Sequence, residues 1–147
     1  MTEQRIVKAT RTINAAADEV FELIADPARQ PEWDGNDNLA EAPAGQRITS
    51  AGQAFTMELT NGQSRTNHVV EFEETRLIAW LPAPTGEQPR GHLFRWELRP
   101  VTQSTTEVTH TYDWTELTDE SRFERARQYT EEALLNSVNR LAQLAEK

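Results

Sequence analysis

Residues 118–145 contain no proline or glycine, and their apolar side chains recur at the spacing of one helix face. On a helical wheel, one narrow stripe contains Phe123, Arg127, Thr130, Leu134, Val138, Leu141 and Ala145. Thr118 can cap the start, so the pattern predicts one helix about 40 Å long. The stripe needs a broad apolar partner, and a strongly curved sheet can wrap it. Because Arg127 and Thr130 interrupt its N-terminal half, that half is expected to face something other than a dry core.

Most of the remaining chain alternates between apolar and polar residues, as in an antiparallel sheet with one wet side. Asn61-Gly62 separates two alternating runs and is a strong signal for a tight hairpin. The predicted strands are 5–13, 39–48, 54–60, 64–73, 76–81, 91–99 and 105–115, with a loop at 82–89. Residues 16–25 and 27–33 have helical spacing instead, and Asp26-Pro27 separates them. The predicted order is therefore a strand, two short helices, six strands and a long helix.

The composition narrows the possible partners. A chain of 147 residues is expected to form one domain over residues 1–147, and its mean hydropathy of −0.72 is rather polar. A net charge of −9 disfavours nucleic acid and anionic membranes as partners. Cysteine is absent, and we see neither a membrane-spanning apolar run nor a signal peptide. We expect a soluble cytoplasmic protein, a monomer or weak homodimer, without membrane insertion. Phosphate-loop, nucleophile-elbow and metalloprotease motifs are also absent, and no cofactor is expected.

The segment 15–27, AAADEVFELIADP, and the following PEWD at 31–34 resemble the N-terminal signature of the START-like, or Bet v 1-like (SRPBCC), superfamily. The resemblance is closest to the bacterial polyketide cyclase/dehydrase branch, and the order of elements extends it over the whole chain. It implies an α+β helix-grip fold, in which a curved antiparallel sheet wraps a long C-terminal helix. The matching residues belong to a helix and turns, so the resemblance implies no catalytic residue. The superfamily includes lipid and hormone carriers, aromatase/cyclases and co-chaperone domains.

Strand alternation predicts which side chains line the concave side of the sheet. If the aromatic residues point at the helix, this side contains Phe72, Phe94, Trp96, Tyr112 and all three histidines, His68, His92 and His110. The histidines are either anchors for a ligand or a metal, or groups that hydrogen-bond within the wall. We expect no tightly bound metal, because cysteine is absent and the histidines lie on different strands. Five of the apolar side chains have two possible roles: they form ordinary core, or they form an aromatic wall around a flat ligand. These are Phe55, Met57, Trp80, Phe94 and Trp96.

Arg127 is the most unusual residue of the helical stripe. It can extend into solvent, or it can hold a carboxylate, phenolate or enolate in a pocket. Phe123 and Thr130 share its part of the stripe and are candidate pocket residues with it. Trp33, at the end of the second short helix, is expected either near the mouth of the pocket or under that helix as a packing anchor. Solvated surface is the expectation for the acidic residues Glu32, Asp34 and Asp37.

Three functions are compatible with these patterns. The first is binding of a small hydrophobic ligand, aromatic or lipid-like, in a cavity between the sheet and the C-terminal helix. The second is a polyketide cyclase/dehydratase-type enzyme, in which a histidine or Tyr112 moves a proton while Arg127 steadies an enolate. The third is a protein-interaction module, of co-chaperone or toxin–antitoxin type, without a true pocket. A pocket well below about 300 Å³ favours the third function.

Overall fold

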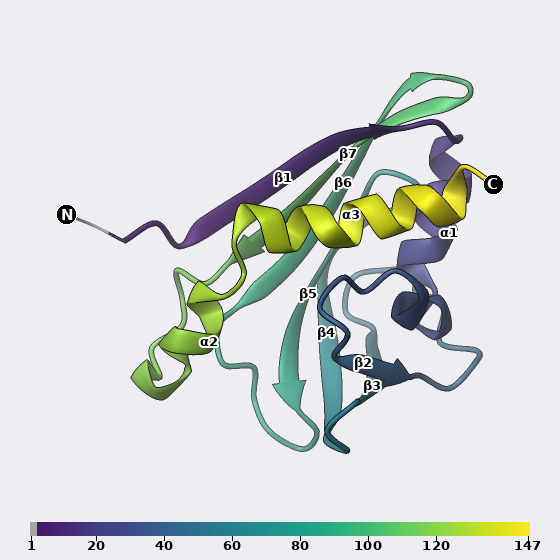
Figure 1. Ribbon diagram of the computed structural model, residues 1–147. Coiled ribbons are helices and arrows are strands. Elements are labelled where there is room, and N and C mark those ends of the chain that lie inside the picture. The colour runs from purple at the N-terminus through teal and green to yellow at the C-terminus, as the bar shows by residue number, and fades with distance from the viewer. Residues whose placement is uncertain (1–2) are drawn as a thin grey trace.

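A curved antiparallel sheet is the frame of the fold in the computed structural model, which describes residues 3–147 (Figure 1). Its strands are β1 (Ile6–Ile13), β2 (Leu39–Glu41), β3 (Ala54–Leu59), β4 (Ser64–Glu73), β5 (Leu77–Pro84), β6 (Leu93–Thr102) and β7 (Thr105–Asp113). They lie in the order β1-β7-β6-β5-β4-β3-β2, so β2 to β7 follow one another and β1 pairs with the last strand. The predicted sequence of strands is confirmed.

Helices cover the concave face of this sheet. The helix α1 (Ala17–Ala25) and the 3₁₀ helix η1 (Pro27–Glu32) connect β1 to β2. After β7 come the 3₁₀ helix η2 (Glu120–Arg122), α2 (Phe123–Arg127) and α3 (Glu131–Ala145), and α3 crosses in front of the sheet (Figure 1). No helix within residues 3–147 is long and apolar enough to cross a membrane. The arrangement is the α+β helix-grip fold that the sequence predicted.

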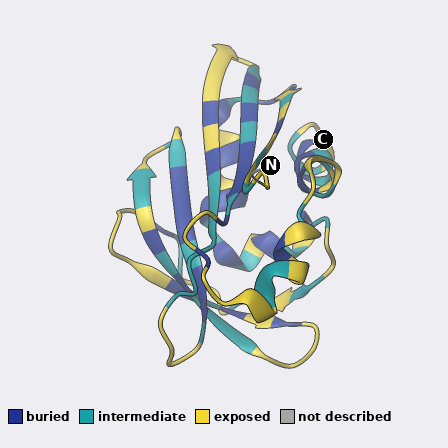
Figure 2. Ribbon diagram, turned by 90° about the vertical axis from the view of Figure 1, so that its left-hand side faces the viewer, coloured by how far each residue is buried: buried dark blue, intermediate teal, exposed yellow. Residues whose placement is uncertain are grey.

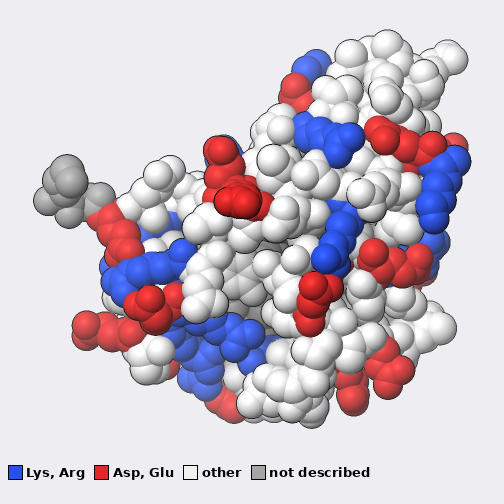
Figure 3. Space-filling model, viewed as in Figure 1, with Lys and Arg blue, Asp and Glu red and all other residues white. Residues whose placement is uncertain are grey.

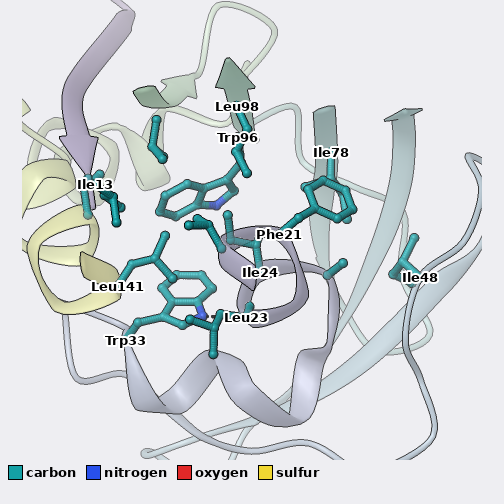
Figure 4. Packing of buried hydrophobic residues seen from close by; sticks show 14 of the residues in the cluster. Ile13, Phe21, Leu23, Ile24, Trp33, Ile48, Ile78, Trp96, Leu98 and Leu141 are labelled. Atoms are coloured by element: carbon teal, nitrogen blue, oxygen red, sulfur yellow. Dashed lines mark hydrogen bonds between the residues drawn. The ribbon is translucent and has the colours of Figure 1, made fainter. Parts of the chain in front are cut away.

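The core lies between α1, α3 and the inner face of the strands. Buried and exposed residues alternate along most strands (Figure 2), as the period of a strand requires. Trp96 of β6 is fully buried and contacts Trp33 edge to face, with ring centroids 5.1 Å apart. The Trp33 indole also donates a 2.7 Å hydrogen bond to the Leu23 carbonyl (Figure 4), which fixes the segment after α1 against the core. Leu141 of α3 packs in the same cluster.

The expectation of one helix over 118–145 is wrong, because the chain breaks between α2 and α3. Thr130 has an extended backbone (φ −83°, ψ 170°), and its side chain accepts a hydrogen bond from the Ala133 N–H as the cap of α3. Asp119, rather than Thr118, caps the preceding turn by accepting from Ser121 N–H. The break resets the rotation of the helix. Residues before and after it therefore do not share the continuous stripe drawn on a single wheel.

The bounds of several strands also differ from the sequence expectation, and two of these differences bear on the cavity. The weak strand expected over 39–48 shrinks to the three residues of β2. Strand β5 instead extends through Pro84, into the predicted loop. Strand β6 pairs with β5 only as far as Trp80, so Pro82 and Pro84 lie where β5 has no neighbour on that side, a position that tolerates proline. The parting of β5 and β6 beyond Trp80 leaves room for the cavity described below.

A β-bulge in β4 overturns the predicted direction of His68. Val69 is opposite Trp80 and Glu71 is opposite Ala79, so Val70 is an extra residue without a partner on β5. One extra residue reverses which face the side chains reach. Phe72 therefore points into the core, where it contacts Phe21, whereas Asn67 and Val69 are buried before the bulge and His68 is on the other face.

Candidate functional site

A cavity of about 120 Å³ lies between the concave face of the sheet and the segments that carry Trp33 and α2. Eight of the candidate residues line it: Trp33, Met57, Trp80, His92, Phe94, Trp96, His110 and Tyr112. The prediction that Trp80 and Trp96 lie on the concave side is confirmed. The sequence also predicts a cavity between these strands and the N-terminal half of one long C-terminal helix. The structure has the cavity against these strands, but its other side includes the segment 117–129, which precedes α3 and does not form one long helix with it. Trp33 forms part of the inner wall and is buried, so it acts as a packing anchor rather than a residue of the mouth.

Arg127 does not line this cavity, and its expected place there is wrong. Its side chain is half-exposed, and its Nε lies 2.6 Å from Glu3 Oε1, with Glu124 also in range of an ion pair. It borders a separate, more open groove beside β1. Thr130 borders the same groove and caps α3, and Phe123 packs edge to face on Trp114. The break before α3 is the reason, since it turns this side of α2 away from the sheet.

Two other candidates lie outside the cavity for different reasons. Phe55 is buried behind the wall and supports it, with its ring edge to face against Trp80 at 5.4 Å. His68 is on the opposite face of the sheet because of the bulge at Val70. The three histidines therefore do not converge. Within residues 3–147, no three His, Cys, Asp or Glu side chains are grouped as a metal would require.

Aromatic rings form most of the cavity wall. His110 stacks on Trp96 with centroids 3.8 Å apart, and Tyr112 stacks on Tyr129 at 4.3 Å. Phe94 lies between these pairs, with its centroid 5.0 Å from Tyr112 and 5.4 Å from Tyr129. Tyr129 reaches the wall because it precedes the extended Thr130, and sequence reasoning missed it for that reason. The wall presents ring faces and edges to whatever occupies the cavity.

Three arginines lie on the lining, and sequence reasoning missed all of them: Arg65 of β4, Arg122 of η2 and Arg125 of α2. Arg122 lies 3.5 Å from Asp119, whereas Arg65 and Arg125 form no ion pair with any residue in the described range 3–147. Burial lowers the pKa of Arg65, and the charges of Arg125 and Arg122 lower it further. Figure 3 shows basic side chains gathered beside a hollow on the face that carries α2. The cavity thus has an aromatic interior and a positive edge.

Both histidines of the cavity are neutral at pH 7. Burial lowers the pKa of His92 to about 4, and Arg122, Arg125 and Arg65 lower it in the same direction. Burial lowers the pKa of His110 to about 3 and outweighs the backbone of Leu134, which acts in the opposite direction. Burial raises the pKa of Tyr112, and the neighbouring Tyr129 adds to this. The site therefore strongly disfavours charge on these rings, in contrast to its three arginines.

A polar loop closes one side of the cavity. The buried carboxylate of Asp34 accepts hydrogen bonds from the backbone N–H groups of Asn36, Asn38 and Leu39, at 2.9–3.1 Å. Gly35 donates its N–H to Ser137 Oγ of α3 at 2.9 Å. Asp34 is therefore a structural anchor, and its expected place on solvated surface is wrong. Of the neighbouring acidic residues, Asp37 pairs with Arg140 and Glu32 pairs with Arg29 at the surface.

Several known proteins resemble this chain. A family model described as "polyketide cyclase / dehydrase and lipid transport" matches residues 4–82, more than half of the chain. An uncharacterized protein of Mycobacterium tuberculosis is 28% identical over 113 residues, which cover 73% of this chain and 47% of the relative. The chain thus spans about half the length of the curated relatives that it matches.

Solved structures of low sequence identity share the fold. The Zhui aromatase/cyclase from Streptomyces sp. R1128 is 18% identical with a TM-score of 0.68, over 97% of this chain and 93% of the other. The Aha1 dimer from Colwellia psychrerythraea is 16% identical with a TM-score of 0.60, over 97% and 95%. Their likeness concerns the fold alone. The sequence match over residues 4–82 and the helix-grip fold place this chain in the polyketide cyclase/dehydrase and lipid transport family.

Proposed function

We propose that the protein binds a small, flat apolar ligand in the cavity between the sheet and the segment preceding α3. The main support for this proposal is that aromatic rings of β5, β6 and β7 surround a space instead of filling it. Apolar walls with a few placed polar groups are typical of small-molecule sites. The family description, which includes both cyclases and lipid transport, is consistent with such a ligand.

The size of the cavity limits the ligand. At about 120 Å³, it is below the range of about 300–1,000 Å³ that is common for drug-sized ligands. An apolar cavity of about 150 Å³ in another protein holds benzene. We therefore propose a ligand with one ring, or one short apolar segment, in the cavity. By volume alone, a cavity of about 120 Å³ favours an interaction module. We nevertheless propose a small ligand, because a filled core gives no reason for the three arginines Arg65, Arg122 and Arg125 on the lining.

Binding is favoured over proton-transfer catalysis by the protonation states of the site. A general acid or base works best when its pKa lies near the operating pH. The pKa of His92 is about 4 and that of His110 about 3, so both are weak bases, and the raised pKa of Tyr112 makes it a poor acid. We therefore rank the cyclase/dehydratase alternative second, after ligand binding.

Phenylacetamide, a neutral one-ring probe, tests the proposal by titration into isotope-labelled protein followed by NMR. Its addition should shift the amide resonances of residues around Trp80, Phe94 and Tyr112. The variant Ala83→Leu adds bulk to the buried lining and should weaken binding about tenfold or more. Ala40→Leu makes the same change at an exposed position of β2 and should bind like wild type. An absence of shifts up to the solubility limit with phenylacetamide and with its charged one-ring analogues, or equal affinity for Ala83→Leu and wild type, would overturn the proposal.

A further inference from the structure

The arginines on the cavity lining are arranged unfavourably for a protein without a ligand. Arg65, Arg122 and Arg125 come from three separate elements, β4, η2 and α2, and share one lining. Like charges that approach one another destabilise a fold. The chain has a net charge of −9, so it contains more than enough acidic residues to pair with these arginines.

The carboxylates near these arginines are already engaged. Asp119 lies 3.5 Å from Arg122, and Glu87 pairs with Arg90. Asp34 accepts three backbone hydrogen bonds from its own loop. Arg65 donates to neutral acceptors, the Ser64 carbonyl and the Gln63 side chain, and its pKa is lowered by burial and by the other two arginines. Within residues 3–147, the charges of Arg65 and Arg125 are therefore not compensated by a salt bridge.

We infer that the ligand of the cavity is an acid, with its apolar ring among the aromatic residues and its carboxylate or phosphate group held by Arg65, Arg122 and Arg125. This inference rests on the proposed function and names the chemical class of its ligand. The guanidinium groups suit planar or tetrahedral oxyanions, since each offers several N–H donors in a fixed geometry. An anion at this point removes the repulsion among the three charges. Because the cavity is small, only a short linker separates the ring from the anionic group.

Arg127 supplies a matched control. It belongs to α2, like Arg125, but its guanidinium pairs with Glu3 and Glu124 and does not line the cavity. A Gln substitution at either position removes one positive charge from the same short helix. Only the loss at position 125 removes a charge from the cavity lining.

The experiment compares probes that differ in charge and in the ring. Phenylacetate and phenylacetamide have nearly the same shape, phenyl phosphate carries the alternative anionic group, and inorganic phosphate has no ring. Wild type, Arg65→Gln, Arg125→Gln and Arg127→Gln are titrated with each probe and followed by NMR. The amide spectrum of each variant also reports whether it is folded, and Arg125→Gln changes an exposed residue.

The expected result is that phenylacetate or phenyl phosphate binds wild type at least tenfold more tightly than phenylacetamide, the advantage of a charge-assisted hydrogen bond. Arg65→Gln and Arg125→Gln should each reduce this advantage about tenfold, and Arg127→Gln should retain it. Whichever of phenylacetate and phenyl phosphate binds more tightly identifies the anionic group of the ligand as a carboxylate or a phosphate. Equal affinity of the acids and the amide for wild type overturns the inference but leaves the proposed function intact. Inorganic phosphate binding as tightly as phenyl phosphate also overturns the inference, because the ring then plays no part. Absence of binding by every probe that contains a ring overturns the proposed function itself.

Discussion

The imidazole of His110 lies flat on the indole of Trp96, with ring centroids 3.8 Å apart and an angle of 12° between the planes. Both side chains are buried, and no hydrogen bond of good geometry reaches the His110 nitrogens or Trp96 Nε1 from residues 3–147, although the Leu134 backbone is near enough to His110 to raise its pKa. A buried polar group without a partner is costly, and charging it is more costly still. His110 therefore contributes a ring surface to the cavity wall. Its burial lowers the stability of the folded protein by an amount that depends on pH.

The first prediction concerns that pH dependence. The pKa of His110 is about 3 in the folded protein against 6.5 for the ordinary side chain, because of burial. Below pH 6.5 the unfolded chain binds a proton that the folded chain does not, so stability falls as the pH falls from 6.5 toward about 3. The contribution of this residue is about 1.4 kcal/mol per pH unit. His110→Phe should reduce the slope of unfolding free energy against pH by that amount, as measured by urea denaturation. An unchanged slope would show that His110 is not buried in its neutral form.

The second prediction concerns His92 and its neighbours. Burial is the largest cause of its pKa of about 4, and the charges of Arg122, Arg125 and Arg65 lower it further, with Tyr112 the adjacent titratable ring. Arg125→Gln removes one positive charge and should raise the pKa of His92 by less than about one unit, since partly exposed charges interact weakly. NMR titration of the His92 ring protons against pH measures this pKa in wild type and variant. Arg127→Gln should leave the value unchanged, and a similar rise in both variants would contradict the placement of Arg125.

The third prediction tests α3 as part of the core. Leu141 is fully buried in the cluster that contains Trp33 and Trp96. Leu141→Ala leaves a cavity and should reduce the free energy of unfolding by about 2–5 kcal/mol. Gln143 is exposed on the same helix, and Gln143→Ala should change stability by no more than about 0.5 kcal/mol. Equal denaturation midpoints for the two variants would show that the helix is peripheral.

The fourth prediction concerns the close approach of Gly35 to α3. A Cβ atom at position 35 would lie 2.6 Å from the backbone nitrogen of Ser137 and 2.8 Å from the carbonyl carbon of Asn136. Because these are backbone atoms of a helix, the loop has to move, and Gly35→Ala should cost about 1–3 kcal/mol of stability. Asn36→Ala, at the exposed neighbouring position, should stay within about 0.5 kcal/mol of wild type. Denaturant unfolding of both variants measures the difference, and a neutral Gly35→Ala would contradict the contact.

The sequence by itself determined the order of elements and most of the aromatic wall. Alternation along β6 and β7 correctly placed Trp96 and Tyr112 on the concave side, because a regular strand has a fixed period of two. The N-terminal motif correctly implied the family and the helix-grip fold. Neither conclusion depends on the exact position at which an element ends.

Tertiary structure decided which charged residues reach the cavity. Because of the bulge at Val70, Arg65 and Asn67 lie on the inner face of β4, and His68 lies on the other face. The extended Thr130 ended the helical phase, so Arg122, Arg125 and Tyr129 face inward while Arg127 faces Glu3. One feature adds a single unpaired residue, Val70, to β4, and the other takes residues 128–130 out of the helix between α2 and α3. A periodic pattern cannot reveal such an irregularity, because every side chain beyond it changes direction while the sequence of apolar and polar residues stays the same.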